Sequence, residues 1–191
     1  MKGSPIAAVL CAPGTNRDSD VSFALKQAGA TPISYLMSDL ISQPSRIDDA
    51  DIFVIAGGFS YADALGAGRL FAVELENSIG DRIRAAITER RPVIGICNGF
   101  QTLVRMGILP EDKRLAALGH NDGGVFDCRW IEMEPVSKKC IWTRNLTENI
   151  HCPIAHGEGR LTAGSSTVSA LLRNDQIALR YVNGNPNGSV G

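Results

Sequence analysis

Short apolar runs alternate with longer amphipathic segments along the first half of the chain. Each apolar run is bounded by glycine, proline or polar residues, a pattern that predicts buried strands. The runs span residues 6–11, 32–37, 51–56 and 92–96. Residues 18–28 carry Val21, Ala24 and Leu25 at helical spacing, and residues 70–89 are also predicted to be mostly helical. Strands that alternate with helices indicate an α/β protein whose parallel sheet is covered on both faces.

The pattern changes after Gly107. Residues 125–134 partly alternate between apolar and polar positions, which predicts an antiparallel or edge strand, and 139–142 is its candidate partner. Further on, 166–172 is expected to form a short helix and 176–182 a strand. Because no internal repeat and no linker interrupts the sequence, residues 1–191 are expected to form a single domain.

Composition excludes several functional classes. The 191 residues are 44% apolar with a net charge of −1, and the absence of a basic tract argues against nucleic acid as a partner. We find no apolar run of about 18 residues and no signal peptide, so we expect no membrane association. The five cysteines are widely spaced without a C-x-x-C pair, which predicts neither disulfides nor a metal site. A reducing cytoplasm is the expected location.

Gly95-Ile96-Cys97-Asn98-Gly99 is the stretch with the clearest chemistry. It follows a predicted strand and precedes a predicted helix, which is the context of a nucleophile elbow. Cys97 would lie exposed at a helix N-terminus, where the helix dipole favours the thiolate form. The alternative is a buried cysteine on a glycine-rich turn. The strand, the paired glycines and the following helix together favour a catalytic Cys97.

A cysteine nucleophile that attacks a carbonyl needs an oxyanion hole. Elbow geometry makes the backbone N–H of Asn98 one candidate donor. Gly58, at the end of another predicted strand, is the second, because glycine permits the backbone turn that directs an N–H into a site. Gly57-Gly58 is equally compatible with an ordinary turn on these residues alone.

The choice of a catalytic base is less direct. His156 and Glu158 are two residues apart, so on an extended segment they could face the same way as a base and its orienting carboxylate. A polar loop at a ligand or subunit interface is the alternative interpretation of the segment His156 to Arg160. The chain holds two other histidines, His120 and His151.

Several blocks of this sequence resemble the class I glutamine amidotransferases, and most closely the glutaminase subunits of phosphoribosylformylglycinamidine synthase. The resemblance covers almost the whole chain, and blocks in the same order are more specific than any single one. The blocks are Pro13-Gly14-Thr15-Asn16 with Asp18 and Asp20, Gly57-Gly58-Phe59-Ser60-Tyr61 with Asp63, Leu65-Gly66-Ala67-Gly68, Gly95 to Gln101, Ala155 to Arg160, and Asn185-Pro186-Asn187-Gly188-Ser189.

The resemblance implies a three-layer αβα fold with a flavodoxin-like, mostly parallel sheet and a strand–nucleophile–helix elbow. It implies that Cys97 hydrolyses glutamine through a thioester and that Gly58 and Asn98 form the oxyanion hole, with Gln101 near the substrate. The ammonia would pass to a synthase large subunit that makes formylglycinamidine ribonucleotide in purine biosynthesis, with a small accessory subunit as a further candidate partner. No cofactor is expected in this chain, whereas ATP and magnesium are expected at the synthase.

Three departures from the family pattern have consequences. Ala62 stands where relatives usually have Gly, and Gly123 stands where they often have Ser. A Gly at position 62 would suit a positive φ. Family members continue into a Pro-His-Pro-Glu block with the catalytic histidine and glutamate, which would lie beyond Gly191. We therefore expect the C-terminal part of the domain to be missing and the chain to be inactive without it. His156, Glu158 and Arg160 match a different block, which we expect at a partner interface or the site rim.

Two other functions remain as alternatives at this point. A catalytically incomplete binding or assembly subunit would keep the fold without a working triad; the missing histidine and glutamate favour it, and the intact elbow opposes it. An unrelated cysteine hydrolase on the same architecture is also compatible with the fold, because fold does not determine chemistry. The blocks around Ser60 and His156 count against that second alternative.

Overall fold

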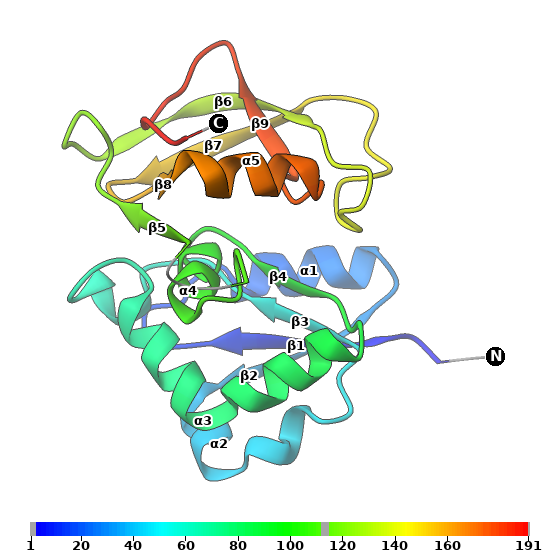
Figure 1. Ribbon diagram of the computed structural model, residues 1–191. Coiled ribbons are helices and arrows are strands. Elements are labelled where there is room, and N and C mark those ends of the chain that lie inside the picture. Colours follow the sequence, from blue (N-terminus) through cyan, green and yellow to red (C-terminus); the bar gives the residue numbers. More distant parts are fainter. Residues whose placement is uncertain (1–2, 112–114, 191) are drawn as a thin grey trace. The chain divides into compact units, whose positions relative to one another are not determined.

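The computed structural model describes residues 3–111 and 115–190, and the chain divides into two compact units (Figure 1). The first is Met1–Leu109 and the second is Pro110–Gly191. The single domain expected over residues 1–191 stays a prediction, and its terminal residues, Met1 and Gly191, lie outside the described part.

A parallel sheet forms the centre of the first unit. Its strands follow the order β2-β1-β3-β4, and all neighbouring pairs are parallel, as the alternating pattern predicted. Successive residues of β1 point to opposite faces: Leu10 belongs to one apolar cluster and Val9 to the other. The strands are β1 (Ile6–Cys11), β2 (Thr31–Leu36), β3 (Ile52–Ile55) and β4 (Val93–Gly95).

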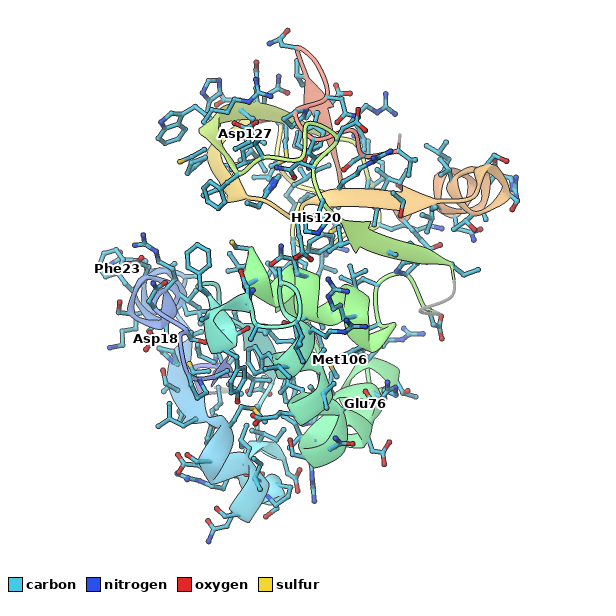
Figure 2. All side chains as sticks on the ribbon, turned by 90° about the vertical axis from the view of Figure 1, so that its left-hand side faces the viewer. Asp18, Phe23, Glu76, Met106, His120 and Asp127 are labelled. Atoms are coloured by element: carbon cyan, nitrogen blue, oxygen red, sulfur yellow. The ribbon has the colours of Figure 1, made fainter. Side chains whose placement is uncertain are left out.

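Helices cover both faces of this sheet, which confirms the three-layer αβα prediction within the unit. The larger cluster includes Leu40, Leu75 and Leu103, one from each of three helices, and the smaller cluster includes Val21 of α1. The opposite side of α1 faces solvent, where Phe23 is 65% exposed and points away from the sheet (Figure 2). The helices are α1 (Asp18–Gln27), α2 (Met37–Ser42), α3 (Arg69–Thr88) and α4 (Asn98–Met106), with short 3₁₀ segments at Pro44–Ile47 and Ser60–Asp63.

The second unit contains antiparallel strands and one helix. The alternation at 125–134 predicted β6 correctly as antiparallel, although β6 is a central strand, with β7 and β9 on its two sides. The helix predicted at 166–172 is confirmed as α5, and the strand predicted at 176–182 is present but shorter. The elements are β5 (Ala116–Gly119), β6 (Asp127–Pro135), β7 (Ile150–His156), β8 (Arg160–Ala163), α5 (Ser165–Arg173) and β9 (Leu179–Val182).

The strand predicted at 139–142 is wrong. Ser137 Oγ accepts hydrogen bonds from the N–H groups of Lys139 (3.1 Å) and Cys140 (2.9 Å), and the chain turns there. A serine side chain that binds nearby N–H groups competes with a strand ladder for the same donors. The strands that pair with β6 therefore come from later segments, Ile150–His156 and Leu179–Val182.

Candidate active site

Cys97 occupies the turn between β4 and α4, as the elbow prediction required. It is the residue before the first helical position, and its backbone adopts φ 54° and ψ −112°. A positive φ in a residue with a Cβ is sparsely populated and persists where the surrounding structure enforces it. Cys97 is an exposed free cysteine, so its Sγ is accessible to a substrate.

Close backbone packing around two glycines holds this turn in place. A Cβ on Gly99 would collide with the carbonyl group of Ile55 in β3, and a Cβ on Gly95 would collide with the backbone of Gly99. Only glycine at both positions allows the first turn of α4 to lie directly against the sheet. The start of α4, and with it Cys97, is therefore fixed relative to β3 and β4.

Gly57 and Gly58 lie at the same edge of the sheet as Cys97. A Cβ on Gly57 would lie 3.2 Å from the Cβ of Cys97, which places the end of β3 beside the nucleophile candidate. Gly58 has φ +139° and packs against the loop after β1, where Phe59 N–H donates to Gly14 O at 3.1 Å. Within the described residues, the N–H groups of Gly58 and Asn98 donate to no other protein group. Their role as an oxyanion hole remains a prediction.

The side chain of Asn98 is buried in a polar network. Its exposed fraction is 2%, and its Oδ1 accepts a hydrogen bond from the Ser60 hydroxyl. Its Nδ2 donates to Asp63 Oδ1 at 2.8 Å and to Gln101 Oε1 at 3.2 Å. Gln101 thus contacts the residue after Cys97, and its proximity to a substrate stays a prediction. The sequence placed Ser60 and Asp63 in a family block without a role for either.

The turn that carries Ser60 and Asp63 has an unusual backbone. Tyr61, Ala62 and Asp63 all have φ 53°. The Tyr61 hydroxyl donates to the carboxylate of Glu74 on α3. Burial, together with the hydrogen bond to Glu74 and its negative charge, raises the pKa of Tyr61 well above its usual value. This bond ties the turn to the long helix of the unit.

The conformation of Ala62 explains why a glycine at this position suits the fold. Ala62 is exposed and left-handed, so its Cβ adds steric strain and no packing. We expect Ala62→Gly to raise the free energy of unfolding by about 0.5–1 kcal/mol, measured by urea denaturation. The control is Ala85→Gly at an exposed position of α3, which should lower it by about 1 kcal/mol. A destabilised Ala62→Gly variant would contradict this account.

In the second unit, the residues from His156 to Arg160 are anchored to the turn at Asn121 and Asp122. His156 ends β7, and its Nδ1 lies 2.9 Å from Asn121 Oδ1. Arg160 begins β8 and forms an ion pair with Asp122 at 2.9 Å. Burial lowers the pKa of His156 below its usual value. These contacts give His156 and Arg160 a structural role in the unit, and Glu158 lies between them in the connecting turn.

Gly123 has room for a larger residue. A Cβ there would have only Val125 near it, at 3.9 Å, so the serine that relatives often have at this position would fit.

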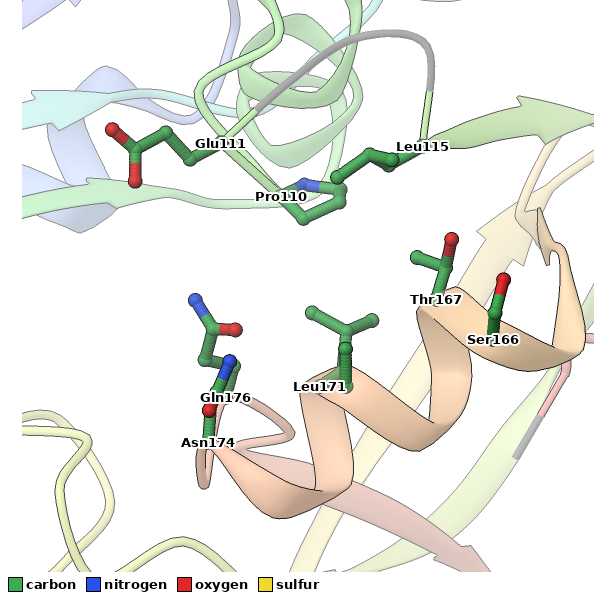
Figure 3. Close-up of a pocket in the computed structure, with 9 residues that line it drawn as sticks. Pro110, Glu111, Leu115, Ser166, Thr167, Leu171, Asn174 and Gln176 are labelled. Carbon is green, nitrogen blue, oxygen red and sulfur yellow. The ribbon is translucent and has the colours of Figure 1, made fainter.

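A pocket of about 400 Å³ lies elsewhere in the second unit, between α5 and the chain around Pro110 and Leu115 (Figure 3). None of the predicted site residues lines it.

Neither a membrane span nor a metal-binding cluster is found among the described residues. Across 3–111 and 115–190, no helix has both the length and the apolar character needed to cross a membrane. In the same ranges, no group of three or more His, Cys, Asp or Glu side chains is placed to hold a metal ion.

Comparison with known proteins gives one consistent family. The CobB/CobQ-like glutamine amidotransferase domain matches residues 4–191. Phosphoribosylformylglycinamidine synthase subunit PurQ of Treponema denticola is 47% identical, over 97% of this chain and 80% of that protein. The same subunit of Dehalococcoides mccartyi is 38% identical, over 85% of this chain and 65% of that protein.

A solved structure agrees with these relatives. The structure of PurLQS from Thermotoga maritima contains a chain that matches 97% of this one with a TM-score of 0.73 and 31% identity, and 78% of that chain is covered. With the elbow at Cys97 and a domain match over nearly the full length, the chain belongs to the CobB/CobQ-like glutamine amidotransferase family.

Proposed function

We propose that this chain is the glutaminase subunit of a phosphoribosylformylglycinamidine synthase, which hydrolyses glutamine and supplies the ammonia for one step of purine biosynthesis. The observation that carries the proposal is the exposed Cys97 on a strand-to-helix elbow, with Gly57-Gly58 beside it. Relatives that bear the name of this subunit support the choice of synthase.

The proposed reaction proceeds in two stages at Cys97. Its thiolate attacks the side-chain amide carbon of glutamine, and the carbonyl electrons move onto oxygen, where the N–H groups of Gly58 and Asn98 stabilise the charge. The carbon–nitrogen bond then breaks, the nitrogen takes a proton and leaves as ammonia, and a thioester remains. Water adds to the thioester and expels the Cys97 thiolate, which releases glutamate.

His156 is not our candidate for the proton transfers in this reaction. Its Nδ1 is engaged by Asn121, and burial favours its neutral, structural form. The family resemblance assigns the acid–base role to a histidine in a block that matches none of the three histidines of this sequence. We propose instead that His156, Glu158 and Arg160 contribute to the site rim or to a partner interface, where charges chiefly tune association.

The proposed partner is a synthase large subunit, with a small accessory subunit as a further component. ATP and magnesium would act at that partner, where the ammonia is used, and this chain would need no cofactor of its own. The PurLQS structure from Thermotoga maritima, whose name denotes an assembly, supports a multi-subunit synthase. The proposed location is the cytoplasm, whose reducing conditions suit free cysteines.

Because the resemblance assigns the acid–base role to a C-terminal histidine and glutamate, the test is an assay of this chain joined to the family's Pro-His-Pro-Glu block, together with the large and small synthase subunits of its source. We expect glutamine to yield glutamate and product in equal amounts, while asparagine, one methylene shorter, yields neither. Synthesis with ammonium salts serves as the control for a working synthase. If the complex used ammonium normally and never formed glutamate from glutamine, the proposed glutaminase function would be excluded.

A further inference from the structure

The residue after the nucleophile is held from two directions by its neighbours. The side chain of Asn98 uses both of its N–H hydrogens, toward Asp63 and Gln101, and its oxygen accepts from Ser60. On its other side, the Thr102 hydroxyl donates to the Asn98 carbonyl oxygen at 2.9 Å. Asn98 therefore has little freedom to rotate as long as these bonds are intact.

Two of these partners come from one strained turn outside α4. Ser60 is 3% exposed and lies at the start of the turn, and Asp63, with φ 53°, lies at its end. Left-handed residues in a row persist only where surrounding contacts enforce them. The Asn98 side chain supplies such contacts at both ends of the turn, so the turn and the elbow constrain each other.

This coupling has a direct consequence for the backbone N–H of Asn98. The side-chain bonds fix the positions of the Asn98 Cα and Cβ, and Asn98 is the first helical residue of α4. With both constraints, the peptide group between Cys97 and Asn98 has little room to rotate. An oxyanion donor is effective when it is already directed at the position where charge develops. The hydroxyl of Ser60 and the carboxylate of Asp63 are buried or half-buried and cannot be replaced by bulk water without rearrangement of the turn.

Resting on the proposed glutaminase function, we propose that Ser60 and Asp63 are positioning residues for the oxyanion hole. They hold the N–H of Asn98 toward the oxyanion, so they stabilise the transition state and contribute little to the binding of glutamine. Loss of a whole oxyanion donor costs about 10²–10³-fold in kcat. A misdirected donor retains part of its effect, and we expect Ser60→Ala to lower kcat about tenfold with KM changed less than about twofold.

The decisive probe is the γ-aldehyde analogue of glutamine, glutamate γ-semialdehyde. The Cys97 sulfur adds to its aldehyde carbon, the carbon–oxygen π bond opens, and the resulting oxygen occupies the oxyanion position in a reversible hemithioacetal. In the assembled synthase, Ser60→Ala should weaken inhibition by this aldehyde about tenfold, in parallel with kcat. Ser60→Thr keeps the hydroxyl and should restore both values, and Asp63→Asn, which keeps Oδ1, should be milder than Asp63→Ala.

Ser78→Ala is the matched control, because Ser78 donates its hydroxyl to Glu74 O within α3 at 2.6 Å and does not contact Asn98. Thermal melting of each variant identifies any that fails to fold. If Ser60→Ala does not fold, Asp63→Asn and Asp63→Ala are compared instead. The inference is overturned if Ser60→Ala raises KM at unchanged kcat, or if folded variants keep the wild-type aldehyde affinity. A wild-type complex whose Cys97 binds no aldehyde and hydrolyses no glutamine would instead overturn the proposed function itself, and this inference with it.

Discussion

Replacing Cys97 by alanine will abolish glutamine hydrolysis and leave ammonium-dependent synthesis by the assembled synthase intact. Without the sulfur no thioester forms, and removal of a covalent nucleophile lowers kcat by at least about 10³-fold. The measurement is glutamate release from glutamine, compared with product formation from ammonium salts in the same preparation. A variant that retained glutamine hydrolysis would show that Cys97 is not the nucleophile.

Labelling by a glutamine-like chloroketone supplies the complementary experiment. Cys97 should react ahead of the other cysteines because it is exposed on the elbow. Burial and the nearby charge of Asp18 raise the pKa of Cys11 to about 12, and burial raises that of Cys152, which keeps both as thiols. Cys128 is the stringent comparison, since it is also exposed, and Cys128→Ala should leave labelling and turnover unchanged. Equal labelling of all cysteines would contradict the assignment of Cys97 as the nucleophile.

Replacing Gly99 by alanine should damage the fold and the site together. The added Cβ would overlap the backbone carbonyl group of Ile55. This group is part of strand β3, so it cannot move aside as a flexible side chain could. We expect the free energy of unfolding to fall by about 3 kcal/mol, measured by urea denaturation. The start of α4 should also shift, with reduced labelling of Cys97 in whatever fraction remains folded.

Gly119→Ala is the control for this substitution. Gly119 lies in β5, and a Cβ there would have no neighbour within 4 Å. Its unfolding free energy should change by less than about 0.5 kcal/mol, as for most surface substitutions. Similar losses in the two variants would show that the packing of Gly99 on β3 is not the cause.

The elements of the first unit were predictable because local pattern and tertiary role agree there. Residues such as Val54 and Ile55 lie in a strand buried on both faces, so the apolar run and the strand coincide. The elbow was predictable for the same reason, since Gly95 and Gly99 are required by close backbone contacts that leave a signature in sequence. The polar partners of Asn98 were not, because hydrogen bonds between Ser60, Asp63 and Asn98 have no periodicity.

The second unit was harder to predict because its strands are only partly buried. In β8 every residue is intermediate in exposure, so neither an apolar run nor a clear alternation marks it. The segment from His156 to Arg160, expected to be a loop throughout, contains the end of β7 and the start of β8. Its predicted role at an interface or rim rests on the resemblance and is still a prediction.

The central position of β6 dictates an order of events as the chain leaves the ribosome. Its neighbours β7 and β9 both follow it in sequence, and β9 pairs with it through Glu132 and Val182 only after α5 has been made. The strand β7 reaches β6 earlier, because it is the next strand in the sequence and Met133 pairs with Ile150. The contacts of β6 with β7 are therefore closer in sequence than its contacts with β9. One side of β6 stays open longest during synthesis, and an unpaired strand is the place where nascent chains associate wrongly.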